Sequence, residues 1–527
     1  MPTALTAPKV PALMVVPVAP GEPVATVVPR PVVGRRARRV PVVRAPLVAP
    51  VVRVIPRVAP VPPVLAALMA SRGSRARDED HGRWASRRFS GRGRIEPRAD
   101  LERSRNVTLS VDTLVELLRQ QGARCGEKTA LSFSYCGDGR DGSQVSYREL
   151  DTRARAIGAA LQQRGAAGSR VLVVCGAGLD GIAGVFGCLY AGAAAVPVAE
   201  RVGPGLASVI ADVRPGFVVA APQGPASVRL AVDTVTERAG GEPLAWCSSE
   251  DGDAAAWVAP AIDANSIAII HYPPGSVPCP KGVVVTHEQV LTNLEAIAAA
   301  GWGDHRDVVV SWLPMQYERG LIGGVLAGIH RGATTVLMAP SAFIARPLCW
   351  LEAISRWRAT VTMAPDVAYR VCVQRSTRAQ RESLDVSSLA RAVITGTEPV
   401  RAATMAAFSE AFAPAGFRSQ AFAPVYGVAE ATLLVSGGSE SAGPRVCHLD
   451  RGGLASGWAL DTDPEDPGAV AVVGCGRARQ QVVIVDPDTR VECGPDEVGE
   501  IWVGGPGVAQ GYWGAPRQSD QIFEAFR

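Results

Sequence analysis

The sequence predicts an α/β fold with mostly parallel strands, preceded by an irregular tail and followed by a smaller β-rich part. Three observations carry this prediction. Short apolar runs alternate with helically periodic segments between residues 107 and 440, and such alternation requires crossover connections between parallel strands. From residue 441 the helical pattern gives way to short β runs divided by Gly, Pro and Asp turns. Proline recurs every few residues in residues 1–68, which excludes regular helices there.

The charge of the chain is concentrated at its N-terminus. The 527 residues carry a net charge of +4, but up to Arg77 twelve Lys or Arg residues oppose one acid, Glu22, which leaves about +11 in this segment and about −7 elsewhere. The part of the chain after Arg77 is therefore mildly acidic, which is not typical of a nucleic-acid-binding protein. We expect residues 1–106 to form a disordered, basic, Pro/Val/Arg-rich tail. Two interpretations stay open for it: contact with an anionic partner, or a flexible leader.

The cysteines and histidines are dispersed rather than grouped. The chain has eleven Cys, an odd number, without a C-x-x-C pair, and six His. We therefore expect a reducing, cytoplasmic compartment with thiols acting as small apolar side chains, and no metal cluster. Pro or Arg interrupts each apolar run before it reaches about 18 residues, so no membrane span is predicted.

The elements of the body follow from local periodicity. The first is a helix within residues 107–124, where Leu114, Leu117 and Leu118 share one face and Ser110 or Asp112 supplies the cap. A strand at 129–134 and a strand entering a helix at 145–163 come next. Further strands are predicted at 170–174, 194–198, 267–270, 283–285, 308–311, 335–338, 360–363, 392–395, 470–473, 481–485 and 499–503. Further helices are predicted at 179–190, 321–329, 348–356 and 401–412.

Residues 267–282, IAIIHYPPGSVPCPKG, contain a candidate phosphate loop. Gly275, Ser276, Lys281 and Gly282 lie between two apolar runs. Such a loop between buried strands is typical of phosphate binding, with backbone N–H groups around the phosphate and one mobile positive charge. Four prolines within the loop have no N–H to donate. Lys281 is therefore either a phosphate ligand or an ordinary surface lysine.

Several segments together resemble the adenylate-forming, or AMP-binding, superfamily, and most closely its fatty acyl-AMP ligases. They are VSYRELDTRARAIGAAL, GCLYAGAAAVPV, the loop above, VVSWLPMQYERGLIGG, TGTEPVRAATM, VYGVAEATLLVSGG and VGEIWVGGPGVAQGYW. The resemblance implies a large domain of stacked, mostly parallel sheets over residues 107–440 and a β-rich subdomain over 441–527. It also implies that a fatty acid carboxylate attacks ATP, with Mg²⁺, to give an acyl-adenylate and pyrophosphate in lipid or polyketide biosynthesis. The implied partners are the fatty acid and an acyl carrier protein or polyketide synthase.

The resemblance also assigns roles to individual residues. Lys281, Glu430 and Tyr317 are the catalytic candidates, with Glu430 as the Mg²⁺ ligand and Tyr317 at the position of a family histidine. Tyr426 is expected to stack on the adenine. The residues expected to contact the nucleotide are Tyr272, Gly275, Ser276, Gly282, Gly396, Glu398, Tyr426, Gly427 and Thr432.

The sequence departs from the family pattern within these motifs. Pro273 and Pro274 replace a Thr and a Ser of the phosphate loop, Val277 replaces a Thr, and Tyr317 replaces the His. The chain ends at Arg527, before the family's T-G-D-L segment and lysine-bearing C-terminal domain, so a truncated large domain is expected. Three hypotheses stay open: an active ligase, a non-catalytic acyl- or nucleotide-binding scaffold, and a decayed gene product. The departures favour the latter two.

Overall fold

The computed structural model describes most of the chain beyond residue 110. The described ranges are 52–55, 111–136, 141–176, 178–200, 204–221, 226–238, 240–248, 250–273, 281–302, 304–396, 398–438 and 443–524. The chain divides into two units, residues 1–47 and residues 48–527, and every described residue belongs to the second unit. Apart from residues 52–55, the predicted tail lies outside the described residues and stays a prediction.

One seven-stranded sheet is parallel except at one edge. Its strands are β2 (Thr129–Ser134), β3 (Asp141–Ser146), β10 (Val308–Ser311), β11 (Thr334–Leu337), β12 (Val361–Ala364), β13 (Arg391–Ile394) and β14 (Phe422–Pro424). They lie in the order β14-β13-β12-β10-β11-β2-β3, with only the β2–β3 pair antiparallel. The crossover connections predicted from the alternating sequence pattern are therefore present.

A second seven-stranded sheet combines a parallel part with an antiparallel edge. Its strands are β4 (Arg170–Cys175), β5 (Ala194–Ala199), β6 (Phe217–Val219), β7 (Ala245–Cys247), β8 (Ile267–His271), β9 (Val283–Thr286) and β22 (Gly511–Tyr512). The order is β22-β9-β8-β5-β4-β6-β7, and β9 and β22 run antiparallel to their neighbours. The predicted class of mostly parallel sheets is confirmed.

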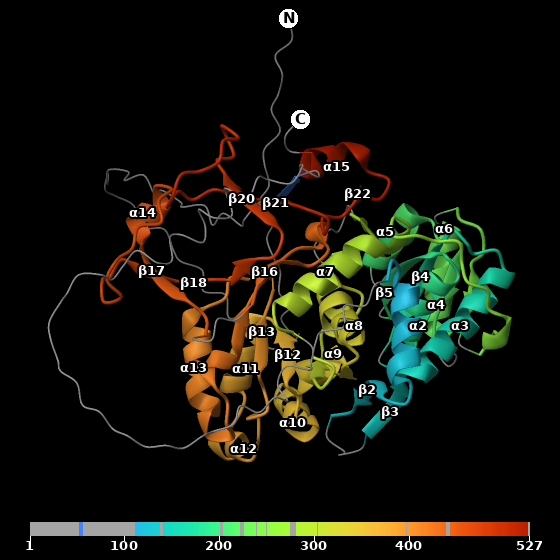
Figure 1. Ribbon diagram of the computed structural model, residues 1–527, viewed down its shortest axis with the longest axis horizontal. Helices are drawn as coiled ribbons and strands as arrows, with labels where there is room; N and C mark the ends of the chain where they lie inside the picture. Colours follow the sequence, from blue (N-terminus) through green and yellow to red (C-terminus); the bar gives the residue numbers. More distant parts are fainter. Residues whose placement is uncertain are drawn as a thin grey trace, which may run out of the picture. The chain divides into compact units, whose positions relative to one another are not determined.

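Helices lie between the two sheets and cover their outer faces (Figure 1). A shared apolar core joins both sheets to α2 (Leu114–Cys125), α3 (Tyr147–Gln163), α4 (Asp180–Tyr190), α7 (His287–Ala299) and α8 (Ala327–Arg331). The outer face of the first sheet packs on α9 (Pro340–Ala345), α10 (Leu348–Trp357), α11 (Asp366–Gln374) and α13 (Ala402–Phe412), with α12 (Arg378–Glu382) beside α13. The outer face of the second sheet packs on α5 (Pro204–Val213) and α6 (Ala226–Arg238).

The helix starts follow capping chemistry, with one correction. Thr113, and neither Ser110 nor Asp112, caps α2, because its hydroxyl accepts the N–H of Glu116 while the Glu116 carboxylate accepts the N–H of Thr113. This reciprocal pair satisfies two N–H groups that the first helical turn leaves without partners. The same arrangement, with other residues, starts α3 and α7.

Two stretches differ from the predicted elements. The helix expected at 321–329 is an eight-residue π-helix, η2 (Arg319–Leu326), followed by the short α8. The stretch that contains α5, β6, α6 and β7 was not predicted, because its strands have only three residues each and give a weak periodic signal. Among the described residues, no helix is both long enough and apolar enough to cross a membrane.

The C-terminal part is rich in short strands, and its last strand joins the second large sheet. Strand β22 pairs with β9, although it lies within residues 441–527. The strand β1 (Val52–Ile55), within the predicted tail, pairs in parallel with β21 (Glu500–Gly504). The remaining elements are η1 (Ala254–Ala256), η3 (Ala413–Ala415), η4 (Ser419–Ala421), β15 (Tyr426–Gly427), η5 (Ala429–Ala431), β16 (Leu434–Gly437), β17 (Val446–Asp450), α14 (Arg451–Ala455), β18 (Ala469–Val473), β19 (Arg477–Ala478), β20 (Gln481–Val485), β21 (Glu500–Gly504) and α15 (Pro516–Phe523).

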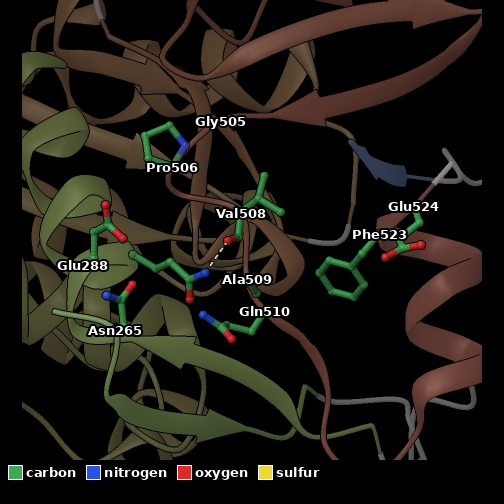
Figure 2. Close-up of a pocket in the computed structure, with 10 residues that line it drawn as sticks. Asn265, Glu288, Gly505, Pro506, Val508, Ala509, Gln510, Phe523 and Glu524 are labelled. Atoms are coloured by element: carbon green, nitrogen blue, oxygen red, sulfur yellow. Dashed lines mark hydrogen bonds between the residues drawn. The ribbon is translucent and has the colours of Figure 1, made fainter. Parts of the chain in front are cut away.

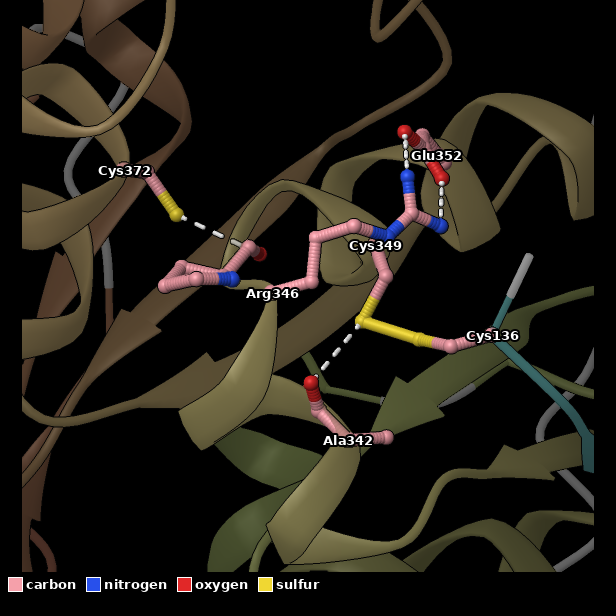
Figure 3. Close-up of a disulfide and its surroundings, with 7 residues drawn as sticks. Cys136, Ala342, Arg346, Cys349, Glu352 and Cys372 are labelled. Carbon is pink, nitrogen blue, oxygen red and sulfur yellow. Dashed lines mark hydrogen bonds and ion pairs between the residues drawn. A yellow bond between two sulfur atoms is a disulfide. The ribbon is translucent and has the colours of Figure 1, made fainter.

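One pair of cysteines departs from the expectation of free thiols. Cys136, directly after β2, forms a disulfide with Cys349 at the start of α10, with the two Cα atoms 5.8 Å apart (Figure 3). That Cα separation lies within the usual range for a disulfide. The expectation that the thiols act only as small apolar groups is therefore wrong for this pair. The same expectation agrees with Cys372, a buried free cysteine nearby, because burial raises the pKa of its thiol to about 12.

Candidate active site

The candidate site lies where β8 ends and β9 begins. Side chains alternate between the two faces of a strand, and Tyr272 packs with Ile270 in the core that faces α5 and α6. The Tyr272 hydroxyl donates to the carboxylate of Asp212 on α5 at 2.6 Å, and burial, followed by this bond, raises the pKa of Tyr272. A Cβ on Gly282 would come within 2.8 Å of the Tyr272 ring. Tyr272 and Gly282 therefore pack on each other at the outer face of the sheet.

Three side chains from distant segments meet beside this loop. The Lys281 ammonium lies over the ring of Tyr512, 5.1 Å from its centroid, which is a cation–π distance. The Tyr512 hydroxyl donates to Glu430 Oε1 at 2.6 Å. Burial, and then the Glu430 carboxylate, raise the pKa of Tyr512, so the phenol keeps its proton. Two of the three predicted catalytic residues are thus joined through a tyrosine that the sequence did not single out.

The segment 507–513, which we call the strap, fixes the relative positions of these groups. Two main-chain hydrogen bonds join the strap to β9 and to the residue just before it. Gln510 N–H donates to Val284 O of β9 at 2.9 Å, and Trp513 N–H donates to Gly282 O at 2.7 Å. Toward η5, Ala509 N–H donates to Glu430 O at 2.9 Å. The strap therefore fixes the position of the Glu430 main chain relative to that of Gly282, the residue next to Lys281.

Two side chains fasten the first half of the strap. Gln289 Nε2 donates to Val508 O at 2.6 Å, beside a cavity of about 290 Å³ (Figure 2). Thr432 Oγ1 donates to Gly507 O at 2.7 Å from a backbone with φ of 68°, a value that is uncommon for a β-branched residue. The structure thus places Thr432 under the strap, where its hydroxyl is already engaged. None of the ten residues that line the cavity belongs to the predicted site.

Tyr426 and Gly427 lie on β15, just before η5. The Tyr426 hydroxyl is buried without a hydrogen-bond partner, and burial, with Glu430 next, raises its pKa to about 12. A Cβ on Gly427 would lie 2.0 Å from Leu433 O, so only glycine fits that turn. The unpartnered hydroxyl leaves Tyr426 able to bind a polar ligand group.

A second group of polar side chains lies in the loop before η2. Tyr317 is half-buried, whereas the Glu318 side chain is 2% exposed and forms an ion pair with Arg319 at 3.1 Å. Burial raises the pKa of Glu318, against the effect of Arg319, and Glu430 adds to the rise. Glu318 and Glu430 are therefore close enough to influence each other, although sequence reasoning did not select Glu318.

His271 is also buried in this region and was also missed. It is 1% exposed, and neither ring nitrogen has a hydrogen bond of ordinary geometry. Burial lowers its pKa to about 4, with the Gln316 main chain acting in the opposite direction. His271 is therefore neutral at pH 7. Its burial between the sheets depends on contacts between segments far apart in the chain.

The other predicted residues are not brought into the group around Tyr512. Gly396 follows β13 and would place a Cβ 3.3 Å from that of Pro365, and Glu398 is exposed. Gly275 and Ser276 lie outside the described residues. The arrangement thus joins Lys281 and Glu430 and sets Tyr426 near Glu430, while the role predicted for each of the site residues stays a prediction.

Two mostly parallel sheets, with Lys281 joined through Tyr512 to the Glu430 carboxylate, agree with the architecture that the sequence resemblance implies for an adenylate-forming domain. A family model described as AMP-binding enzyme matches residues 118–513 of this chain. The chain belongs to this family, in its fatty acyl-AMP ligase branch.

The relatives of the chain include ligases for medium- and long-chain fatty acids. It is 34% identical over 428 residues to the medium-chain-fatty-acid–[acyl-carrier-protein] ligase JamA of Moorena producens, covering 78% of this chain and 72% of JamA. It is also 34% identical over 413 residues to the long-chain-fatty-acid–AMP ligase FadD32 of Mycolicibacterium smegmatis, covering 76% of this chain and 65% of FadD32. The chain thus spans about two thirds of the length of these relatives.

A solved structure shows the same architecture. The fatty acyl-adenylate ligase from Legionella pneumophila, in complex with acyl adenylate and pyrophosphate, superposes with a TM-score of 0.73 at 34% identity. The match covers 79% of this chain and 72% of that one. The fold and the family assignment therefore agree.

Proposed function

We propose that this chain joins a fatty acid to AMP, forming an acyl-adenylate and pyrophosphate from the acid and ATP. The observation that carries the proposal is the Lys281–Tyr512–Glu430 group, because it keeps a mobile positive charge and a carboxylate beside the phosphate-loop position. Such preorganised charges are the main protein contribution to a reaction in which the substrate carboxylate is itself the nucleophile.

The residues present fit ATP with Mg²⁺. Among the described residues no group of three or more His, Cys, Asp or Glu could hold a metal ion. Mg²⁺ is commonly held by one or two carboxylates together with substrate phosphates and water, and Glu430 can supply one such ligand. Lys281 would bind phosphate oxygens, and the unpartnered Tyr426 hydroxyl would contact the nucleoside. Bound ATP supplies the phosphoanhydride that activates the acid.

The remaining partners follow from the chemistry of the relatives. JamA of Moorena producens and TtuA of Teredinibacter turnerae are named as ligases that act on an acyl carrier protein. We extend this to the chain as acyl transfer to a carrier protein or polyketide synthase, in the cytoplasm. In this step a thiol of the carrier would attack the acyl carbonyl, forming a thioester and releasing AMP. Incubating this protein with the acyl-adenylate and purified thiol-bearing carrier protein, and measuring the mass of the carrier with and without this protein, would test the step.

A second candidate function is a non-catalytic acyl- or nucleotide-binding scaffold. Two residues favour it: Pro273 offers no N–H at the start of the phosphate loop, and Tyr317 stands where the family has a histidine. A phenol cannot carry the positive charge of an imidazolium. This candidate requires binding of fatty acid or ATP without turnover.

ATP–pyrophosphate exchange separates the two candidates. Purified protein is incubated with Mg²⁺, ATP, labelled pyrophosphate and either octanoate or palmitate. Exchange that depends on the fatty acid supports the ligase. Its absence at high protein concentration rejects the ligase, and a rise in melting temperature with fatty acid or ATP would then support the scaffold.

A further inference from the structure

We propose that Tyr512 is a positioning residue that orients the Glu430 carboxylate toward Mg²⁺ and holds Lys281 beside it. This inference rests on the proposed function, because it takes Glu430 as a metal ligand. It concerns a residue on β22, a strand that is far from both partners in the sequence.

Tyr512 uses both of its chemical features at once. Its hydroxyl donates to Glu430 Oε1 at 2.6 Å, while the ammonium of Lys281 lies 5.1 Å from the centroid of its ring. Among the described residues, Glu430 Oε2 has no hydrogen-bond donor. The bond to Oε1 thus fixes the rotation of the carboxylate and leaves Oε2 as the ligand atom.

A hydroxyl group suits this position as a hydrogen-bond donor. A protonated phenol can donate to the carboxylate without cancelling its negative charge, as an ammonium or guanidinium would. Hydrogen bonds from such outer groups orient metal ligands, and their loss typically weakens metal affinity about 10- to 100-fold. The ring face adds a cation–π contact that holds the lysine without neutralising it.

Tyr512 is itself held rigidly. Its backbone pairs with Val283 across the β22–β9 edge, and its N–H donates to Ser519 Oγ of α15 at 2.8 Å. The ring of Phe523 meets the Tyr512 ring edge to face at 5.3 Å. The side chain is 7% exposed. Because Tyr512 is held in one position, its hydrogen bond can fix the orientation of the half-buried Glu430 carboxylate.

The test distinguishes the contribution of the Tyr512 hydroxyl from that of its ring. Tyr512→Phe removes only the hydrogen bond, whereas Tyr512→Leu also removes the ring. The matched control is Tyr190→Phe, since the Tyr190 hydroxyl donates to Asp151 Oδ1 at 2.5 Å away from the site. Mn²⁺ binding is followed by electron paramagnetic resonance, with and without ATP, and ATP binding without metal is measured by calorimetry.

We expect Tyr512→Phe to weaken Mn²⁺ binding about 10- to 100-fold and to leave metal-free ATP binding unchanged. Tyr512→Leu, unlike Tyr512→Phe, should weaken metal-free ATP binding by a factor of about 2 to 5. Tyr190→Phe should change neither quantity. Equal Mn²⁺ affinity of wild type and Tyr512→Phe would overturn the inference, as would a wild-type protein that binds no Mn²⁺.

The outcome is independent of whether the protein turns over. A wild-type protein that binds Mn²⁺ with ATP but shows no pyrophosphate exchange would reject the ligase and leave the role of Tyr512 measurable. Melting temperatures of the three variants, compared with wild type, show whether any loss of binding comes from unfolding.

Discussion

Lys281 and Glu430 carry opposite charges, but they are connected through Tyr512 rather than paired directly. A direct ion pair would satisfy each charge with the other and compete with a phosphate or a metal ion. The intervening phenol ring keeps the two charges close without joining them. At the scale of single residues, the site is therefore arranged to receive ligands of both signs, as the phosphates and metal of Mg²⁺–ATP provide.

Replacing Lys281 by Met should lower the rate of ATP–pyrophosphate exchange about 10²-fold, because one preorganised positive charge is lost at the phosphates. The melting temperature should stay unchanged, since within the described part of the chain the Lys281 ammonium interacts only with the Tyr512 ring. Arg378→Met, at an exposed ion pair on α12, is the control for loss of a positive charge. Undiminished exchange would make Lys281 a surface lysine, the alternative that the sequence left open.

The prolines of the phosphate loop give a second test at this scale. Changing Pro273 to Thr together with Pro274 to Ser restores two N–H groups and two hydroxyls. Hydrogen bonds to charged groups contribute about 1.5–3 kcal/mol each, so ATP binding should tighten at least tenfold by calorimetry. If the affinity does not change, the prolines are not what limits nucleotide binding.

Sequence motifs located part of this site and could not locate the rest. Lys281 and Glu430 were predicted because they lie within recognisable local patterns. Tyr512 lies in the segment VGEIWVGGPGVAQGYW, but its role depends on the pairing of β22 with β9. A local sequence pattern cannot predict such a long-range contact. The same loop motif predicts Tyr272 as a nucleotide contact, and this stays a prediction. The bond from its hydroxyl to Asp212 could not be read from the motif.

At the scale of elements, long apolar runs were predictable and irregular ones were not. The bounds of β2, β10 and β20 agree with the prediction because each is a clear apolar run between turns. The π-helical form of η2 was not predicted, because the spacing of its apolar residues does not distinguish it from an α-helix. Its glycines pack tightly, since a Cβ on Gly323 would lie 2.7 Å from Met363 Cε.

A buried histidine joins two helices and should make stability depend on pH. His287 at the start of α7 accepts the N–H of Leu114, the first residue of α2, on Nδ1 at 3.1 Å. Burial lowers the pKa of His287 to about 4. Because the folded pKa lies below the unfolded value, the stabilisation is complete above pH about 6.5 and is lost as the pH falls through about 4.

His287→Gln should therefore reduce the loss of unfolding free energy on acidification. A pKa lowered from about 6.5 to about 4 corresponds to about 3 kcal/mol of pH-dependent stability. Urea denaturation between pH 7 and pH 4 measures this loss, and His305→Gln, at an exposed position, is the control. Some dependence should remain, since the pKa of His271 is lowered in the same way. Parallel curves for His287→Gln and wild type would contradict the prediction.

The disulfide between the end of β2 and the start of α10 should stabilise the first sheet. Cross-links across long loops typically contribute about 2–4 kcal/mol, so reduction with dithiothreitol should lower the melting temperature by several degrees. The double variant Cys136→Ser and Cys349→Ser should show the lower value in both conditions. Equal melting of oxidised and reduced wild type would show that this bond is not formed in solution.

At the scale of the whole described unit, the strap links the C-terminal β-rich part to the second sheet. It accepts hydrogen bonds from Gln289 of α7 and from Thr432 after η5, and it donates one to Val284 O of β9. These three partners are separate in sequence. Loss of order in the strap would release Tyr512, and with it the orientation of Glu430. Stability of this link and integrity of the site should therefore be coupled.

Replacing Thr432 by Val tests this coupling. Val keeps the β-branched shape but removes the hydroxyl that bonds Gly507 O, leaving a buried carbonyl without its donor, which costs about 1–3 kcal/mol. Because the cost falls on the strap, amide hydrogens at residues 507–513 should exchange faster, and Mn²⁺ binding should weaken in parallel. Thr236→Val is the control, since its hydroxyl donates to Val232 O within α6 at 2.9 Å. A Thr432→Val protein with normal strap protection and normal Mn²⁺ binding would show that the site does not depend on this link. Faster exchange with unaltered Mn²⁺ binding would show that the site does not depend on the Thr432 bond, because β9 and α15 would then be enough to hold Tyr512.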